Sequence, residues 1–232
     1  MPYVDRTYRR WPESELHTFQ VRVAESDLWI SAERPLADEA ERALRSVRAD
    51  LEQYLERDPD FAGSLKPRMP LAGAPPVVLD MTDAARLCDV GPMAAVAGAV
   101  AERVGKALLS ETGQVMVENG GDIFIYTIQP RVAAIFAGES PLSGRVGIHI
   151  RRIAQSVGLC TSSGTVGPSL SFGSADAAVV LADSTPLADA AATALANRVQ
   201  EPPDIQPALE TLQTIPGVLG GVVIVGEHLG AW

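Results

Sequence analysis

The chain has 232 residues, of which 47% are hydrophobic and 21% are charged, and its formal net charge is −10 at pH 7. This length and composition predict a globular protein with one well-formed core. The negative charge argues against general nucleic-acid binding, which needs a basic surface to displace counterions. We see no apolar run of membrane-spanning length and no apolar signal segment at the N-terminus, so we expect a cytoplasmic protein.

A single domain is expected over residues 18–226, with a loosely held arm over 1–17 and a tail over 227–232. The two cysteines, Cys88 and Cys160, have no spacing typical of a disulfide framework or a metal site. Both stand among apolar or small residues. We therefore expect buried, reduced thiols, which agrees with a cytoplasmic location.

Hairpin and helix patterns follow one another in the first half of the chain. The predicted elements are a hairpin over 18–32, a helix over 35–57 and, after Gly91 and Pro92, a helix of small residues over 93–109. The prolines between the two helices predict a long connection over 58–80, which could serve as a lid or as a surface crossover. Residues 79–90 are ambiguous, because Thr82 or Asp83 could cap a short helix there.

Short strands dominate the second half. Strand patterns cover 115–118, 123–126, 132–136, 146–150, 175–182 and 219–225. Helices are expected over 205–215 and over 186–199, the latter with Ser184 or Thr185 as N-cap and Pro186 at its first position. Because strands and helices do not alternate strictly, the sequence predicts an α+β fold rather than a doubly wound parallel sheet.

Two glycines separate the strands 115–118 and 123–126, in the turn Asn119-Gly120-Gly121-Asp122. A tight hairpin turn explains both glycines. The other interpretation is a turn whose backbone amides meet a phosphate or a planar ring, with Asn119 or Asp122 hydrogen-bonded to it. Both interpretations stay open, since the hairpin accounts less well for the neighbouring acid.

The stretch 158–199 gathers the polar groups that suggest a site. A hydroxyl-rich turn, CTSSGT, is expected at 160–165, ahead of the strand 175–182. On the helix that follows, Asp189 and Thr193 lie four residues apart and share one face. They could form a hard-cation or phosphate site. Equally, Asp189 could compensate the helix dipole at the surface while Thr193 packs as a small residue.

Three motifs together resemble the ApbE superfamily, the FAD:protein FMN transferases, and more narrowly its smaller, uncharacterised ApbE-like branch. They are VGPMA at 90–94 before the small-residue helix, NGGDI at 119–123, and TSSG at 161–164 followed by ADAAATAL at 188–195. The last motif is the most specific, because it resembles the family's ADAxATAL helix. The resemblance implies an ApbE-like, T-fold-related α+β fold in which mixed or antiparallel sheets pack with two long helices.

The resemblance also implies a ligand site. Asp189 and Thr193 would hold a magnesium ion on the pyrophosphate of FAD, the ligand or substrate, and a carbonyl near Pro92 would be a third ligand of the metal. The residues implied to border the flavin or another nucleotide-like ligand are Gly91, Pro92, Asn119, Gly120, Gly121, Asp122, Ser162, Ser163, Gly164 and Thr165.

The chain departs from the transferases in two places. Ala95 stands where they carry a lysine, and GPSLSFGS at 167–174 replaces their His-His-Ile…Asp-Pro segment, with no histidine or acid. The residues therefore identify no catalytic group, although Asp122 or His149 could substitute as a base. His149 by itself is expected to be structural.

Four functions stay open. They are a magnesium-dependent flavin or nucleotide transferase, a non-catalytic flavin- or nucleotide-binding protein, an enzyme acting on another heterocycle, and a purely structural protein. The retained Asp189 and Thr193 argue against the last. The small-residue helix and the N-terminal arm could both form part of a subunit interface. A homodimer is therefore one hypothesis for the assembly.

Overall fold

The computed structural model describes residues 15–151, 155–164 and 172–232, and an eight-stranded sheet forms its centre. The strand order is β1-β2-β3-β4-β7-β8-β9-β10, and every neighbouring pair is antiparallel. A separate antiparallel pair joins β5 to β6. The strands are β1 (His17–Val23), β2 (Ser26–Ala32), β3 (Val115–Asn119), β4 (Asp122–Tyr126), β5 (Arg131–Ala134), β6 (Gly147–Ile150), β7 (Val157–Ser162), β8 (Ala177–Ala182), β9 (Val218–Val225) and β10 (His228–Ala231).

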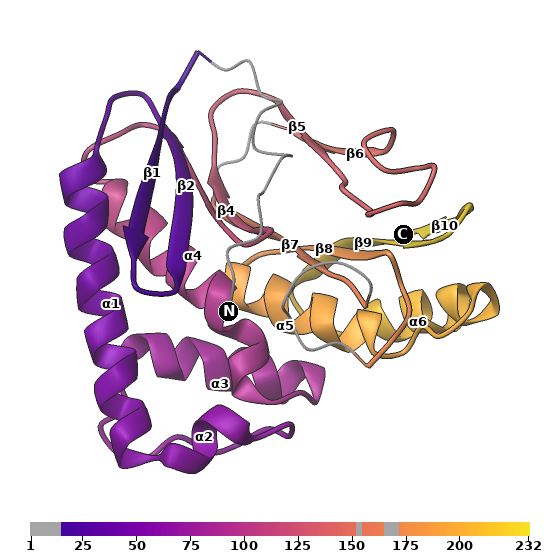
Figure 1. Cartoon of the computed structure of the whole chain (residues 1–232), viewed down its shortest axis with the longest axis horizontal. Helices are drawn as coiled ribbons and strands as arrows, with labels where there is room; N and C mark the ends of the chain where they lie inside the picture. Colours follow the sequence, from indigo (N-terminus) through magenta and orange to yellow (C-terminus); the bar gives the residue numbers. More distant parts are fainter. Residues whose placement is uncertain (1–14, 152–154, 165–171) are drawn as a thin grey trace.

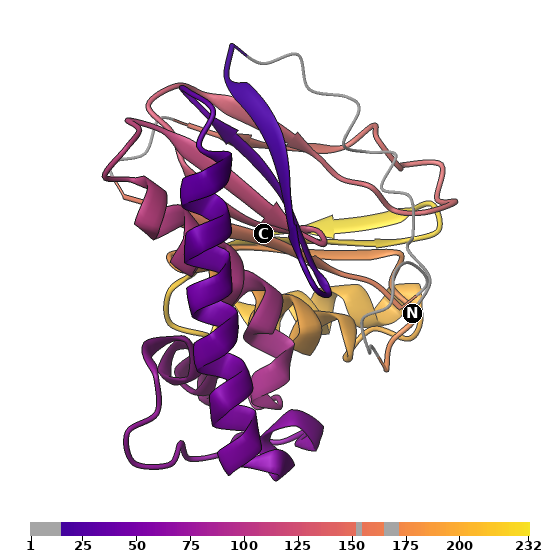
Figure 2. The ribbon, with the colours of Figure 1, turned by 60° about the vertical axis from the view of Figure 1, so that its left-hand side comes forward.

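Helices cover one face of the eight-stranded sheet, and the β5–β6 hairpin lies against the other face (Figure 1). The helical elements are α1 (Ala37–Arg57), α2 (Pro59–Gly63), α3 (Pro76–Cys88), η2 (Pro92–Ala95), α4 (Val96–Leu108), α5 (Thr185–Ala196), η3 (Pro202–Asp204) and α6 (Ile205–Leu212). Helix α1 packs along α4, as Figure 2 shows. This arrangement confirms the predicted α+β class.

Alternation along the strands sorts side chains between the two faces. In β4, Phe124 faces the helices and packs with α1 and α4, whereas Ile125 packs with the hairpin. In β8, Val180 faces the helices and Val179 faces the hairpin. The sheet is therefore covered on both faces at β4, β7 and β8, and any polar group between β4 or β7 and the helices lies in the interior.

Two predictions about the first half of the chain need correction. The connection expected over 58–80 contains the short helix α2, and α3 begins at Pro76. Thr82 and Asp83 therefore lie within a helix and do not cap one. Proline at the first helical position explains both early starts, because its fixed φ suits a helix and its missing N–H leaves no bond unmade. The helix expected over 93–109 begins as the 3₁₀ turn η2.

Two predictions about the second half also need correction. Residues Cys160 to Ser162, expected in a turn, belong to β7 and pair with β8 in the register Cys160↔Val180. The end of the chain, expected to be a tail, forms β10 and pairs with β9. In both cases a neighbouring strand supplies the backbone partners that local sequence cannot reveal.

Among the described residues, no single helix is both long and apolar enough to cross a membrane. The segments Pro76–Cys88 and Pro92–Leu108 reach that length and composition only when taken together, and they are bent by 107° relative to each other.

Candidate functional site

Polar side chains gather on the helix-facing side of β4 and β7. Asp122 begins β4, and it is buried with 7% of its surface exposed. Because alternate residues share a face, Asp122 lies on the same side as Phe124, which packs against α4. In β7, Cys160 faces α5, since its Sγ lies 3.4 Å from the carbonyl oxygen of Thr185. Ser162, two residues further, shares that face.

Helix α5 brings Asp189 to the beginning of α4. The Oδ2 atom of Asp189 accepts a hydrogen bond of 2.8 Å from the backbone N–H of Gly98, in the first turn of α4. The residue at the N-cap position of α4, Ala95, has no side-chain oxygen for this purpose. Asp189 therefore caps a helix other than its own. The dipole that it compensates is that of α4, and its side chain is half-buried rather than on the open surface.

The environment of Asp189 disfavours its negative charge. Burial raises the pKa of its carboxyl group well above the usual range, and the nearby Asp122 carboxylate raises that pKa further. Hydrogen bonds from the amides of Gly98 and Ala97 act in the opposite direction. Two carboxylates thus share a largely dry region, in which a cation would offset their repulsion.

Both cysteines are free and buried, as predicted. Burial raises the pKa of Cys88 to about 12. Burial also raises the pKa of Cys160 well above its usual value, and the charges of Asp122 and Asp189 raise it further. A thiol that stays protonated is a poor nucleophile and a poor metal ligand.

The hydroxyl of Ser162 has no hydrogen-bond partner within the described residues, although the side chain is only 5% exposed. A buried polar atom left unbonded costs free energy, so it often indicates a missing ligand, ion or water. Ser163 is also buried, and its Oγ lies 3.4 Å from the carbonyl oxygen of Ala175. The sequence predictions also involved Thr165 and residues 167–171, and these lie outside the described residues.

The Asn119–Asp122 turn is a tight hairpin, as its sequence predicts, with Asn119 paired to Asp122. Gly120 and Gly121 adopt φ angles of 74° and 108°, which glycine accommodates without strain. The Nδ2 group of Asn119 donates a 3.1 Å hydrogen bond to the carbonyl oxygen of Ala97. The turn is therefore attached to the beginning of α4, where Asp189 also binds.

Two other predicted ligand residues have a packing role in the structure. A Cβ atom on Gly91 would lie 1.8 Å from the backbone oxygen of Ser64, and one on Gly164 would lie 1.9 Å from that of Gly173. Both glycines thus permit backbone segments to cross closely. Pro92 begins η2 directly after Gly91 and is buried.

The structure brings Asp122, Ser162 and Asp189 to one region between the sheet and the helices α4 and α5. Thr193 lies one turn beyond Asp189 on α5 and is half-buried. His149 is not part of this region, because it belongs to β6 in the hairpin on the opposite face and is exposed. Its use as a base at this site is therefore excluded by position.

Sequence reasoning missed the backbone amides of Ala97 and Gly98 and the buried Glu102. The run of small residues at the beginning of α4 was the available signal for Gly98. A Cβ atom there would lie 2.5 Å from the carbonyl oxygen of Thr185 and 2.9 Å from the Cβ of Asp189. Only glycine permits α4 and α5 to approach so closely.

The donor chemistry of the region fits a magnesium ion that also has a phosphate ligand. No cluster of three or more His, Cys, Asp or Glu side chains that could hold a metal occurs in the described ranges. The available groups are carboxylate and hydroxyl oxygens, which suit magnesium. Since magnesium usually keeps waters and substrate phosphates in its shell, a site with few protein carboxylates is compatible with it.

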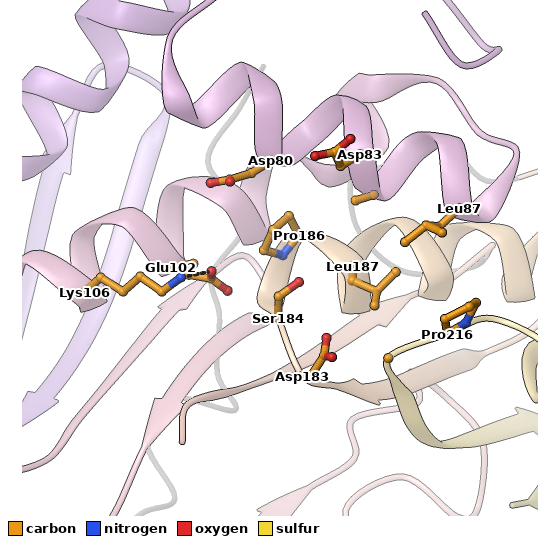
Figure 3. A pocket seen from close by; sticks show the side chains of 12 residues that line it. Asp80, Asp83, Leu87, Glu102, Lys106, Asp183, Ser184, Pro186, Leu187 and Pro216 are labelled. Carbon is orange, nitrogen blue, oxygen red and sulfur yellow. Dashed lines mark hydrogen bonds and ion pairs between the residues drawn. The ribbon is translucent and has the colours of Figure 1, made fainter. Parts of the chain in front are cut away.

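A cavity of about 440 Å³ opens beside the first turn of α5 (Figure 3). Its lining includes Asp80, Glu102, Lys106 and Asp183. None of the site residues predicted from the sequence lines this cavity. It is therefore distinct from the region between Asp122 and Asp189.

Comparisons with known proteins show the family to which the chain belongs. A family model described as AbpE bacteria matches residues 9–213. A UPF0280 protein of Methanocella arvoryzae is 40% identical over 93% of this chain and 88% of its own length. A UPF0280 protein of Methanosarcina acetivorans is 40% identical over 92% of this chain and 85% of its own length.

Solved structures share the fold at low sequence identity. The apo form of the flavinyl transferase ApbE from Pseudomonas stutzeri has a TM-score of 0.60 and 15% identity, covering 94% of this chain and 93% of its own. The ApbE protein of Thermotoga maritima has a TM-score of 0.57 and 11% identity, covering 93% of this chain and 96% of its own. The ApbE-like fold expected from the three motifs is thereby confirmed.

Proposed function

We propose, from the premise that this chain belongs to the ApbE-like family described as AbpE bacteria, that it binds a flavin dinucleotide or a related nucleotide through a magnesium ion beside Asp189. The observation that carries the proposal is the Asp189 carboxylate. It lies near Asp122 in a largely buried region, and its pKa is raised by burial and by that second charge. A bound cation would make this arrangement favourable.

Each group of the region has a role in this proposal. Asp189 and Thr193 would hold the metal, because they share one face of α5 and supply hard oxygen atoms. The bond from Gly98 N–H would orient the Asp189 carboxylate, which can accept further interactions at its remaining lone pairs. Ser162 would give its unbonded hydroxyl to the ligand. Asp122 would add negative charge that attracts the cation.

The magnesium ion would supply charge neutralisation for the pyrophosphate of the ligand. The chain itself would exclude water, since the helices and the sheet bury most of the region. The cytoplasmic location and the homodimer stay predictions, and this proposal depends on neither of them.

Binding without transfer is the function that the residues support best. Ala95, at the position where the resemblance places a lysine, is fully buried. His149, one of the two substitute bases, lies on the other face of the sheet. Asp122 remains the one substitute base in the region. Transfer would therefore require Asp122 to act as the base, and an assay for AMP released from FAD would detect it.

The test is calorimetric titration of the purified chain with FAD and with FMN, each with and without magnesium. We expect magnesium to strengthen FAD binding more than tenfold, or about 1.4 kcal/mol, and to affect FMN less because FMN has no pyrophosphate. Asp189→Ala should abolish the magnesium effect.

A matched control is Asp204→Ala. The Oδ2 of Asp204 also accepts two backbone amide bonds, of 2.9 Å from Gln200 and 3.0 Å from Glu201, but at an exposed turn. This control should keep the magnesium effect. Equal FAD affinity with and without magnesium, or equal effects of the two substitutions, would contradict the metal assignment. Absence of FAD binding under every condition would remove the flavin proposal.

A further inference from the structure

Glu102 is a buried carboxylate in the middle of α4. Only 4% of its surface is exposed, which is rare for a glutamate unless it is paired. Its Oε1 atom accepts a 2.6 Å hydrogen bond from the Nζ of Lys106, one turn later on the same helix. Figure 3 shows this ion pair at the edge of the cavity. The pair explains how the charge is tolerated but not why it is buried.

The other oxygen of Glu102 reaches the beginning of α5. Its Oε2 accepts a 2.6 Å hydrogen bond from the backbone N–H of Thr185, the first residue of that helix. Ser184 occupies the N-cap position, but its side chain makes no capping bond to the described part of the chain. Glu102 therefore replaces the local cap of α5 and places a negative charge at the positive end of its dipole.

Helix α5 in turn caps the beginning of α4. Asp189 of α5 accepts from Gly98 N–H in the first turn of α4, at 2.8 Å. Each helix thus caps the other with one carboxylate. In each helix this carboxylate lies four residues after the residue whose amide is capped, a rise of roughly 6 Å along an α-helix. Between the two bonds, Gly98 contacts the Thr185 carbonyl with no room for a side chain.

This reciprocal capping fixes α5 against α4 at two points. Loss of one point would leave the orientation of α5 relative to α4 dependent on the other capping bond and on side-chain packing. The position of Asp189 depends on that orientation, because the backbone of α5 carries it. Groups that orient a metal ligand typically change metal affinity about 10- to 100-fold when they are removed.

We infer that Glu102 is a positioning residue, whose bond to the Thr185 amide holds Asp189 in place for binding. The test of this inference by ligand binding rests on the proposed function. A second test, which follows the Gly98–Asp189 bond in the ligand-free protein, does not rest on it.

The experiment compares Glu102→Ala with Glu102→Gln in the full chain. The carboxamide oxygen of glutamine can still accept from Thr185 N–H, whereas alanine cannot. We expect the magnesium-dependent affinity for FAD to fall about 10- to 100-fold in Glu102→Ala and less than tenfold in Glu102→Gln. Leu44→Ala, in the core between α1 and the sheet, should lower the melting temperature while leaving FAD affinity unchanged.

Amide hydrogen exchange of Gly98, measured in the ligand-free protein by NMR, gives the independent readout. The Glu102→Ala variant should accelerate Gly98 exchange at least tenfold, and Glu102→Gln should largely restore protection. Unchanged Gly98 exchange in Glu102→Ala would overturn the positioning role whether or not FAD binds. Altered exchange together with no FAD binding in the wild type would leave the positioning role in place and remove the proposed ligand. A parallel loss of FAD affinity in Leu44→Ala would show that Glu102 acts only through stability.

Discussion

The two faces of the eight-stranded sheet differ in how they are covered. On the hairpin face, Ile125, Leu159 and Val179 pack against apolar residues of the β5–β6 segment. On the helix face, Gly158 of β7 lets α5 approach the sheet, and the same face carries Ser162 of β7 and Asp122 of the neighbouring strand β4. The comparison teaches that one sheet can combine an ordinary apolar core with a polar region, because alternate residues of each strand face different partners.

The largest expected effect comes from adding one methyl group to Gly158 on the helix face, and it is compared with the same change at Gly147 on the exposed side of the hairpin. A Cβ atom on Gly158 would lie 2.3 Å from the Cα of Thr185, so Gly158→Ala must push α5 away from the sheet. We expect a loss of about 3 kcal/mol in the free energy of unfolding. On the hairpin, a Cβ on Gly147 would meet the Cγ1 of Val132 at 3.0 Å, where a side chain can adjust.

Gly147→Ala should therefore cost less than about 1 kcal/mol, which urea denaturation of both variants would measure. Equal costs for the two substitutions would contradict the close approach of α5 to β7. A larger cost at Gly147 would contradict the expectation that the exposed side of the hairpin tolerates a methyl group more easily than the helix face does.

A smaller effect is expected from the charge on Asp189. Because burial and the neighbouring Asp122 raise its pKa in the folded state, the folded protein binds its proton more tightly than the unfolded chain does. Stability should then fall as pH rises from the unfolded pKa through the folded one. Asp189→Asn keeps an oxygen that can accept from Gly98 N–H, but it has no ionisable proton and stays uncharged as pH rises.

The measurement is urea denaturation of wild type and Asp189→Asn between pH 4 and pH 8, without divalent cations. The difference between the two proteins removes the contributions of groups that do not interact with Asp189, including Asp80, whose pKa burial also raises. The wild type should lose stability relative to Asp189→Asn as pH rises. A gain would mean that the Gly98 and Ala97 amides outweigh the repulsion.

The local elements of the sequence predicted much of this fold. The Asn119–Asp122 turn, the strand β8 and the helix α5 follow from short-range patterns, so they were found close to their observed positions. The capping of α4 and α5 could not be found in this way. Its two hydrogen bonds join residues 91 and 83 positions apart, and neither carboxylate occupies a usual capping position in its own helix.

The candidate site was predicted only in part for the same reason. The ADAAATAL motif identified Asp189, but its attachment to Gly98 depends on how α4 and α5 cross. Ser162 was assigned to a turn, although pairing with β8 makes it the last residue of a strand. Its burial beneath the helices, which makes its unbonded hydroxyl informative, is a tertiary property.

The smallest expected effect comes from removing the Ser162 hydroxyl, and the buried hydroxyl of Thr127 serves as the comparison. Ser162→Ala removes an oxygen that is already without a partner among the described residues, so the ligand-free protein should lose no stability. Thr127, in the connection that leads from β4 to the hairpin, is bonded at 2.8 Å to the carbonyl of Gln129 and at 3.3 Å to Gln114. Thr127→Val removes these bonds and should cost about 1 kcal/mol, because Gln114 still accepts from Arg131 and Gln129 is exposed.

Thermal unfolding of both variants, with and without FAD and magnesium, separates stability from binding. If the Ser162 hydroxyl serves the ligand, Ser162→Ala should reduce the increase in melting temperature that the ligand produces, whereas Thr127→Val should leave that increase unchanged. A marked loss of stability in ligand-free Ser162→Ala would show that the hydroxyl already has a structural partner. In that case the polar groups on the helix face would find their hydrogen-bond partners within the fold, and the Ser162 hydroxyl would give no reason to expect a ligand.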